Sequence, residues 1–85
     1  MTRDELASIS LQLRDAAVQP EGDAQVAAES FNGWLGRCRE RLRAAVLLHV
    51  RGETVPEKVA IELRQAATAA GARRAVLEKA YGGEF

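Results

Sequence analysis

Hydrophobic residues recur along the chain at spacings of three and four, the period of an amphipathic α-helix, and no segment alternates as a half-buried strand does. The first segment begins after Thr2, which with Glu5 has the spacing of a capping box. It ends before Pro20 and Gly22, residues that interrupt helices. The pattern predicts a helix over about residues 3–19, with one apolar face made of Leu6, Ile9, Leu13, Ala16 and Ala17.

A second helix is predicted over about residues 23–51, capped by Asp23 and ended by Gly52. Two glycines, Gly33 and Gly36, cost roughly 1 kcal/mol each relative to alanine, which leaves open a kink or break near Trp34. The inward stripe of this helix comprises Ala24, Ala27, Phe31, Trp34, Leu35, Cys38, Leu42, Ala45, Val46 and His49. Further apolar residues, namely Leu47, Leu48 and Val50, point away from the stripe, so either the third helix or another protein covers them.

A third helix is predicted over about residues 55–81, because Thr54 and Glu57 repeat the capping spacing with Pro56 in the first turn. Gly71 either lies inside one helix or separates two, and Gly82-Gly83 ends the segment. The inward face reads Val59, Leu63, Ala66, Ala67, Ala70, Leu77 and Tyr81. Its alanines either pack very close to a neighbouring helix or leave room for the side chains of a partner.

These segments predict an all-α fold in a single domain over residues 1–85: a three-helix bundle, or a helical hairpin with a short leading helix. The core is expected to be thin, because 16 of the 85 residues are alanine. No apolar run approaches the roughly 20 residues of a membrane span, and no signal-peptide pattern follows Met1. With one cysteine, Cys38, on the inward stripe, we expect a cytoplasmic protein with a buried, inert thiol. Ten arginines against two lysines in an alanine-rich chain are typical of a GC-rich bacterial or phage genome.

The net charge of zero conceals an uneven distribution along the chain. Residues 1–34 carry a net charge of −4, and residues 35–51 carry +4. The basic segment owes its charge largely to Arg37, Arg39, Arg41 and Arg43, which flank the apolar stripe on both sides. They are expected to cover a helix–helix seam and to meet acidic residues of the first segment, with an acidic partner protein or nucleic acid as the other interpretations.

Candidate chemistry is sparse. Cys38 and His49 would lie roughly 16 Å apart on one helix, too far for a catalytic dyad. One His and one Cys do not make a metal site, and no glycine-rich phosphate loop is present. We therefore expect no enzymatic activity, no cofactor, no metal and no small-molecule substrate.

Two family resemblances suggest other functions. The segment from Ala66 to Leu77 resembles a helix-turn-helix of the Fis type, which implies DNA binding by residues 63–81, with Arg73, Arg74 and Lys79 facing DNA. Trp34-Leu35-Gly36 resembles the tripeptide of the WXG100 secreted proteins of type VII systems, where it lies in the turn between two long helices. That family also carries an acidic residue four positions after a C-terminal tyrosine, where this chain has Phe85.

The sequence favours a non-enzymatic helical interaction module: an adaptor, a subunit or a chaperone-like partner, for instance in a bacterial secretion or other multi-protein system. Leu11 and Val18 form a modest outward stripe on the first helix, either incidental or a contact with another chain. The expected partner is another protein or a second copy of the chain; a membrane is excluded, and nucleic acid is not the expected partner. The candidate binding residues are Leu11, Val18, Leu47, Leu48, Val50, Arg37, Arg39, Arg41 and Arg43.

Overall fold

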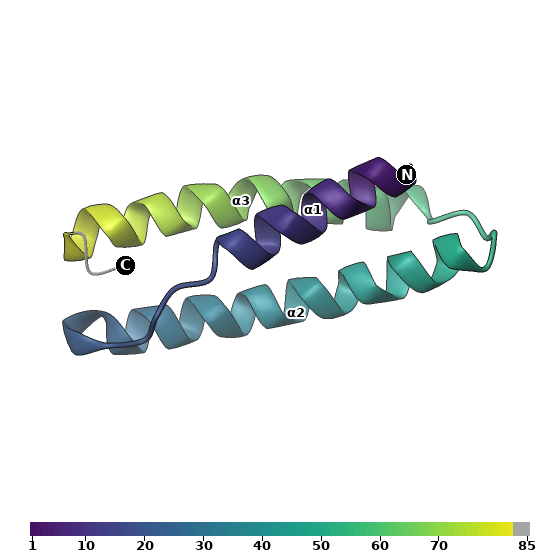
Figure 1. Cartoon of the computed structure of the whole chain (residues 1–85). Helices are drawn as coiled ribbons and strands as arrows, with labels where there is room; N and C mark the ends of the chain where they lie inside the picture. The colour runs from purple at the N-terminus through teal and green to yellow at the C-terminus, as the bar shows by residue number, and fades with distance from the viewer. Residues whose placement is uncertain (83–85) are drawn as a thin grey trace.

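The computed structural model describes residues 1–82, which form three α-helices and no strand (Figure 1). The helices are α1 (Arg3–Asp15), α2 (Gln25–Val50) and α3 (Glu57–Tyr81), and a 3₁₀ turn, η1 (Gly22–Ala24), precedes α2. Helix α1 runs antiparallel to α2 and parallel to α3 (Figure 1). The molecule is elongated, with principal extents of 45 × 18 × 16 Å, and the all-α prediction is confirmed.

Helix α1 begins as predicted and ends earlier than predicted. The Thr2 hydroxyl accepts a hydrogen bond from the Glu5 amide at 3.1 Å, so the predicted cap is present. The helix stops at Asp15 instead of residue 19, and the chain from residue 16 crosses to α2. There Val18 is buried in the core, while its backbone exchanges two hydrogen bonds with the Asn32 side-chain amide, at 2.7 and 3.2 Å. These contacts, together with Pro20, replace the last helical turn.

The predicted caps of the other two helices are wrong. Asp23 lies inside the 3₁₀ turn, and no side chain caps α2. Helix α3 starts at Glu57, with Pro56 as its N-cap and no side-chain cap from Thr54. Proline already has a backbone φ close to the helical value, so Pro56 starts the helix by its own geometry.

Neither α2 nor α3 is broken at its glycines. Helix α2 is continuous through Gly33 and Gly36, and α3 is continuous through Gly71. Buried residues on both sides, Phe31 and Cys38 among them, hold α2 in one helix. Gly82 ends α3 in the left-handed conformation, with φ of 53°, and Gly83 lies outside the described residues.

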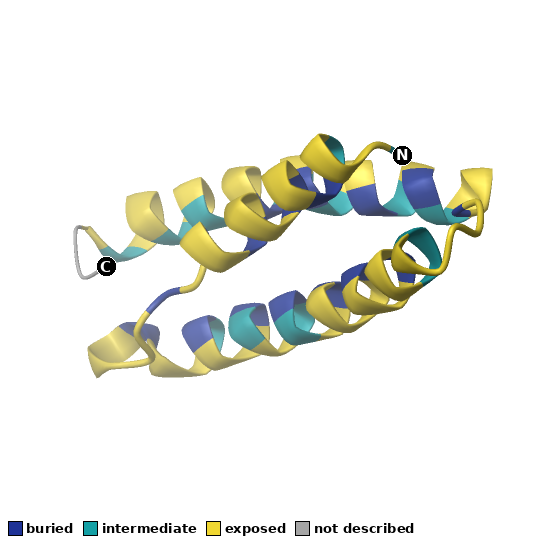
Figure 2. Ribbon diagram, turned by 45° about the vertical axis from the view of Figure 1, so that its right-hand side comes forward, coloured by how far each residue is buried: buried dark blue, intermediate teal, exposed yellow. Residues whose placement is uncertain are grey.

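The core lies along the inner faces of all three helices, where Figure 2 shows the buried positions. Its largest fully buried side chains are Leu13, Leu35 and Leu63, one from each helix. Helix α3 otherwise buries only alanines among its described residues: Ala60, Ala67 and Ala70. Ala67 and Ala70 therefore pack closely against neighbouring helices, as one of the two interpretations of the alanine run predicts.

Helix α1 is half as long as the other two helices, so it covers only part of the α2–α3 hairpin (Figure 1). The N-terminal half of α2 and the C-terminal half of α3 extend beyond it. In that extension, α3 has no fully buried residue after Ala70 within the described chain. The molecule is thus a three-helix bundle at one end, and at the other a two-helix hairpin on which the segment with Val18 and η1 packs. Among the described residues, no helix is both long and apolar enough to cross a membrane.

Candidate interaction surfaces

The predicted binding residues separate into exposed and covered groups. Val50 and Leu47 are 75% and 49% exposed, as expected from their positions on α2. Leu48 is half-buried and packs against the core. Leu11 is 48% exposed, and it is not among the residues that line the groove between α1 and α2. The expectation that Val18 faces outward is wrong: α1 ends before it, and its side chain is 8% exposed.

A patch forms on the last turns of α2, where Val46 joins Leu47 and Val50. We call these three residues the α2 C-terminal patch. Val46, assigned to the inward stripe from sequence, is 36% exposed and stands at the edge of a groove of about 320 Å³ between α1 and α2. The groove is lined by Arg3, Leu6, Ala7, Ser10, Val46, His49 and Val50. His49 is half-buried there, at the rim of the core.

The basic segment of α2 does not pair with the acidic N-terminal segment as expected. Arg39 donates to the backbone oxygen of Leu13 at 3.1 Å, not to a carboxylate. The three ion pairs within residues 1–82 involve Arg14, Arg64 and Arg74, so Arg37, Arg41 and Arg43 have no carboxylate partner among them. Their position on the bundle surface leaves the positive charge of this segment facing solvent.

Within residues 1–82, the one ion pair between different helices joins Glu5 of α1 to Arg64 of α3. Arg64 donates two hydrogen bonds to the carboxylate, at 2.8 and 2.9 Å. This bonding lowers the pKa of Glu5 and raises the pKa of Arg64, because the charged form of each group is stabilised. Helix periodicity gave no sign of this pair, since the two residues are 59 positions apart.

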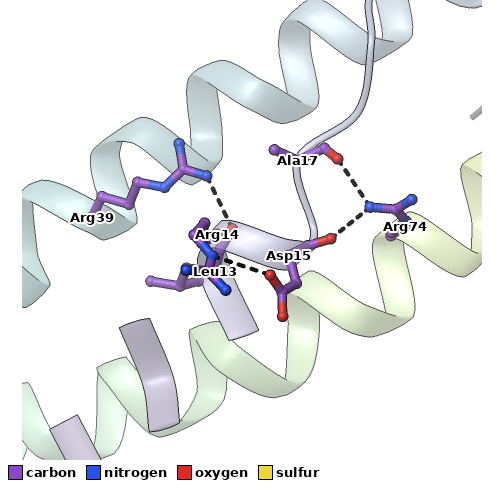
Figure 3. A network of polar contacts seen from close by, with 6 residues as sticks. All are labelled: Leu13, Arg14, Asp15, Ala17, Arg39 and Arg74. Atoms are coloured by element: carbon purple, nitrogen blue, oxygen red, sulfur yellow. Dashed lines mark hydrogen bonds and ion pairs between the residues drawn. The ribbon is translucent and has the colours of Figure 1, made fainter. Parts of the chain in front are cut away.

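Two arginines hold the C-terminus of α1 (Figure 3). Arg39 reaches Leu13 from α2, while Arg74 of α3 donates to the backbone oxygens of Asp15 and Ala17, at 2.6 and 2.9 Å. The last carbonyl groups of a helix lack partners within the helix and carry partial negative charge, so guanidinium groups stabilise them. The helix-turn-helix resemblance placed Arg74 on DNA; the structure places it on α1.

An aromatic cluster lies where α2 and α3 extend beyond α1. Trp34 and Phe31 stack with ring centroids 6.0 Å apart, and the guanidinium of Arg73 lies 4.5 Å from the Trp34 centroid. Beside them is a groove of about 320 Å³ bordered by α2 and α3 alone, lined by Ala27, Ser30, Phe31, Arg73, Val76 and Leu77. The sequence suggested an inward Trp34, but it did not indicate that Arg73 would cover it.

The remaining chemical candidates are structural. Cys38 is buried, and burial raises the pKa of its thiol despite the nearby charges of Arg41, Arg37 and Arg73. A buried, protonated thiol is a poor nucleophile. Within residues 1–82, no three His, Cys, Asp or Glu side chains are placed to hold a metal ion.

The geometry required by the two family resemblances is absent. Residues 63–81 lie in one uninterrupted helix, so there is no turn at Gly71 and no separate recognition helix. Trp34-Leu35-Gly36 lies in the middle of α2, not in a turn between helices. Phe85, on which the comparison with the WXG100 secretion signal depends, lies outside the described residues. Comparison with protein-family models, curated proteins and solved structures finds no match to this chain.

Proposed function

We propose that this chain is a non-enzymatic helical interaction module that binds a protein partner through the α2 C-terminal patch. One observation carries the proposal: Val46, Leu47 and Val50 expose much of their side chains on two successive turns of one helix. In a chain with so few large apolar residues, leaving three of them together in solvent is costly. Burying such side chains contributes about 1.5–3 kcal/mol each when burial is complete.

The groove beside the patch supports the same function. Ala7 and Ser10 of α1 are small, so they leave a shallow channel between α1 and α2 next to Val46 and Val50. A channel between two helices accepts the apolar side chains of a third helix, which is a common mode of peptide recognition. Arg3 borders the channel at one end and offers a polar contact at its rim.

The buried thiol bears on where the module works. A free cysteine persists most readily in a reducing compartment, and Cys38 has no partner for an internal disulfide because it is the sole cysteine of the chain. We therefore place the module in the cytoplasm. The partner there is either another protein or a second copy of this chain.

Site-specific photo-crosslinking in cells tests the proposal. A photoreactive residue at position 50 is expected to give one discrete cross-linked species, while the same residue at position 29 gives none. Glu29 is a suitable control because it is exposed on the same helix, lies more than four turns before the patch and does not line the groove between α2 and α3. The species is expected to disappear when Leu47→Glu is added, and light scattering of the purified chain then separates a second copy from a different partner.

Equal cross-linking at positions 29 and 50, or a cross-link that survives Leu47→Glu, would contradict the proposed surface. Circular dichroism of Leu47→Glu is expected to match the parent chain, because the side chain already faces solvent. If that variant loses helicity, the cross-linking is repeated with the photoreactive residue at position 47 and with Val50→Ser in place of Leu47→Glu, because Val50→Ser introduces no charge.

A further inference from the structure

Three arginines without ion-pair partners lie along one stretch of α2 and α3, and the guanidinium of Arg37 extends towards Gly33. Trp34, Arg37 and Arg41 follow one another at helical spacings of three and four, so they lie along one side of α2. Arg73 of α3 stacks over Trp34 at 4.5 Å. The charges of all three arginines oppose the rise in the pKa of Cys38 that burial causes. None belongs to the three ion pairs of residues 1–82.

The same face is apolar at its other end. Phe31, Val76 and Leu77 line the groove that begins beside Arg73, and Val76 is 67% exposed. From Phe31 to Arg41 the helix rises about 15 Å, or about three turns. The face is therefore polarised along its length, with an apolar groove at the open end of the hairpin, a tryptophan under an arginine in the middle, and two further arginines beyond.

We propose that this face of α2 and α3 binds an acidic amphipathic helix of a partner protein, with apolar side chains in the groove and carboxylates on Arg37, Arg41 and Arg73. Charge complementarity identifies the occupant: the arginines have no carboxylate partner within the described chain, and guanidinium groups pair well with carboxylates. The apolar groove distinguishes this ligand from nucleic acid, which presents phosphates along its whole length. The inference rests on the proposed function only in taking the partner to be a protein.

A peptide titration tests this inference, with the single tryptophan of the chain as the reporter. The probe is a synthetic, tryptophan-free helical peptide of about four turns, with leucines along one face and glutamates elsewhere. Saturable change in Trp34 emission is expected, and a matched peptide with lysine at every glutamate is expected to bind at least tenfold more weakly. Raising the salt concentration is expected to weaken the binding of the acidic peptide.

Two variants locate the binding. The double variant Arg37→Ala, Arg41→Ala is expected to bind the acidic peptide at least tenfold more weakly. Val76→Glu is expected to have the same effect, because it puts a negative charge in the groove that repels the glutamates of the peptide. Arg43→Ala is the matched control: Arg43 is one turn beyond Arg39, on the side of α2 that faces α1, and its loss is expected to change affinity less than twofold.

Equal binding of both peptides, or an unchanged affinity in the arginine pair variant, would overturn the inference. So would binding of oligothymidine in preference to the acidic peptide, which would assign the face to nucleic acid. Leu47→Glu is expected to bind the peptide normally, because the α2 C-terminal patch is a separate surface. Failure of the peptide titration and failure of the cross-link at position 50 are therefore distinguishable.

Discussion

Gly36 stands near the middle of α2, and a Cβ built on it would meet nothing within 4 Å. An interior helical glycine is about 1 kcal/mol less favourable than alanine. We therefore expect Gly36→Ala to raise the free energy of unfolding by about 0.5–1 kcal/mol, measured by urea denaturation. Gly52 is the control, because it also has an open position but adopts φ of +76°, so Gly52→Ala is expected to destabilise the chain. Equal effects of the two substitutions would contradict this explanation.

Glu5 makes the free energy of unfolding depend on pH in the acid range. Hydrogen bonds from Arg64 lower its pKa in the folded state, so its contribution is complete above pH 4.5, the ordinary value, and is lost as the pH falls through the folded value. The stability difference between the parent chain and Glu5→Gln is therefore expected to be largest near neutrality and to shrink in acid. Urea denaturation of both chains from pH 7 to pH 3 measures it; a difference that stays constant over this range would argue against the pair.

At the scale of elements, α1 depends on groups supplied by the other helices. Arg74 is partly buried and donates to two carbonyl groups, that of Asp15 at the end of α1 and that of Ala17 just beyond it. We expect Arg74→Ala to lower the free energy of unfolding by about 1–2 kcal/mol, because charged hydrogen bonds to carbonyl groups are lost. Amide exchange is expected to accelerate in α1 more than in α2 in this variant.

Arg14 provides the comparison for Arg74. It also lies at the end of α1, but its ion pair with Asp15 is about 70% exposed on both sides. Exposed pairs of this kind contribute little, so Arg14→Ala is expected to change stability by less than about 0.5 kcal/mol. A larger loss from Arg14→Ala than from Arg74→Ala would refute the role given to Arg74.

The number and order of the helices could be predicted from periodicity, because the apolar spacing and the breakers at Pro20 and Gly52 are local signals. The residue at which α1 ends could not be predicted in this way. It depends on Val18 entering the core and on arginines from two other helices. The exposure of Leu47 and Val50 followed from their angular positions on α2. The burial of Val18 depended on where α1 ends, which the sequence did not indicate. The stacking of Arg73 on Trp34 joins residues 39 positions apart, for which the chain contains no local signal.

For the whole molecule, the short α1 divides the bundle into ends of unequal stability. Helix α3 buries Ala60, Leu63, Ala67 and Ala70 beside α1, and no described residue after Ala70 is fully buried. Local stability follows buried apolar contact, so amides of residues 74–81 are expected to exchange at least about tenfold faster than those of residues 60–70. Hydrogen exchange by NMR measures this, and uniform protection along α3 would contradict it.

The parallel arrangement of α1 and α3 also determines how the molecule bears a mechanical load. The N-terminus and the C-terminal end of α3 lie towards opposite ends of the 45 Å long axis (Figure 1). Tension applied between them pulls α1 and α3 in opposite directions along their own axes, so the contacts of Leu6, Ile9 and Leu13 are sheared together instead of being peeled apart turn by turn. We therefore expect the bundle to resist stretching along its length better than it resists separation of α2 and α3 at the open end.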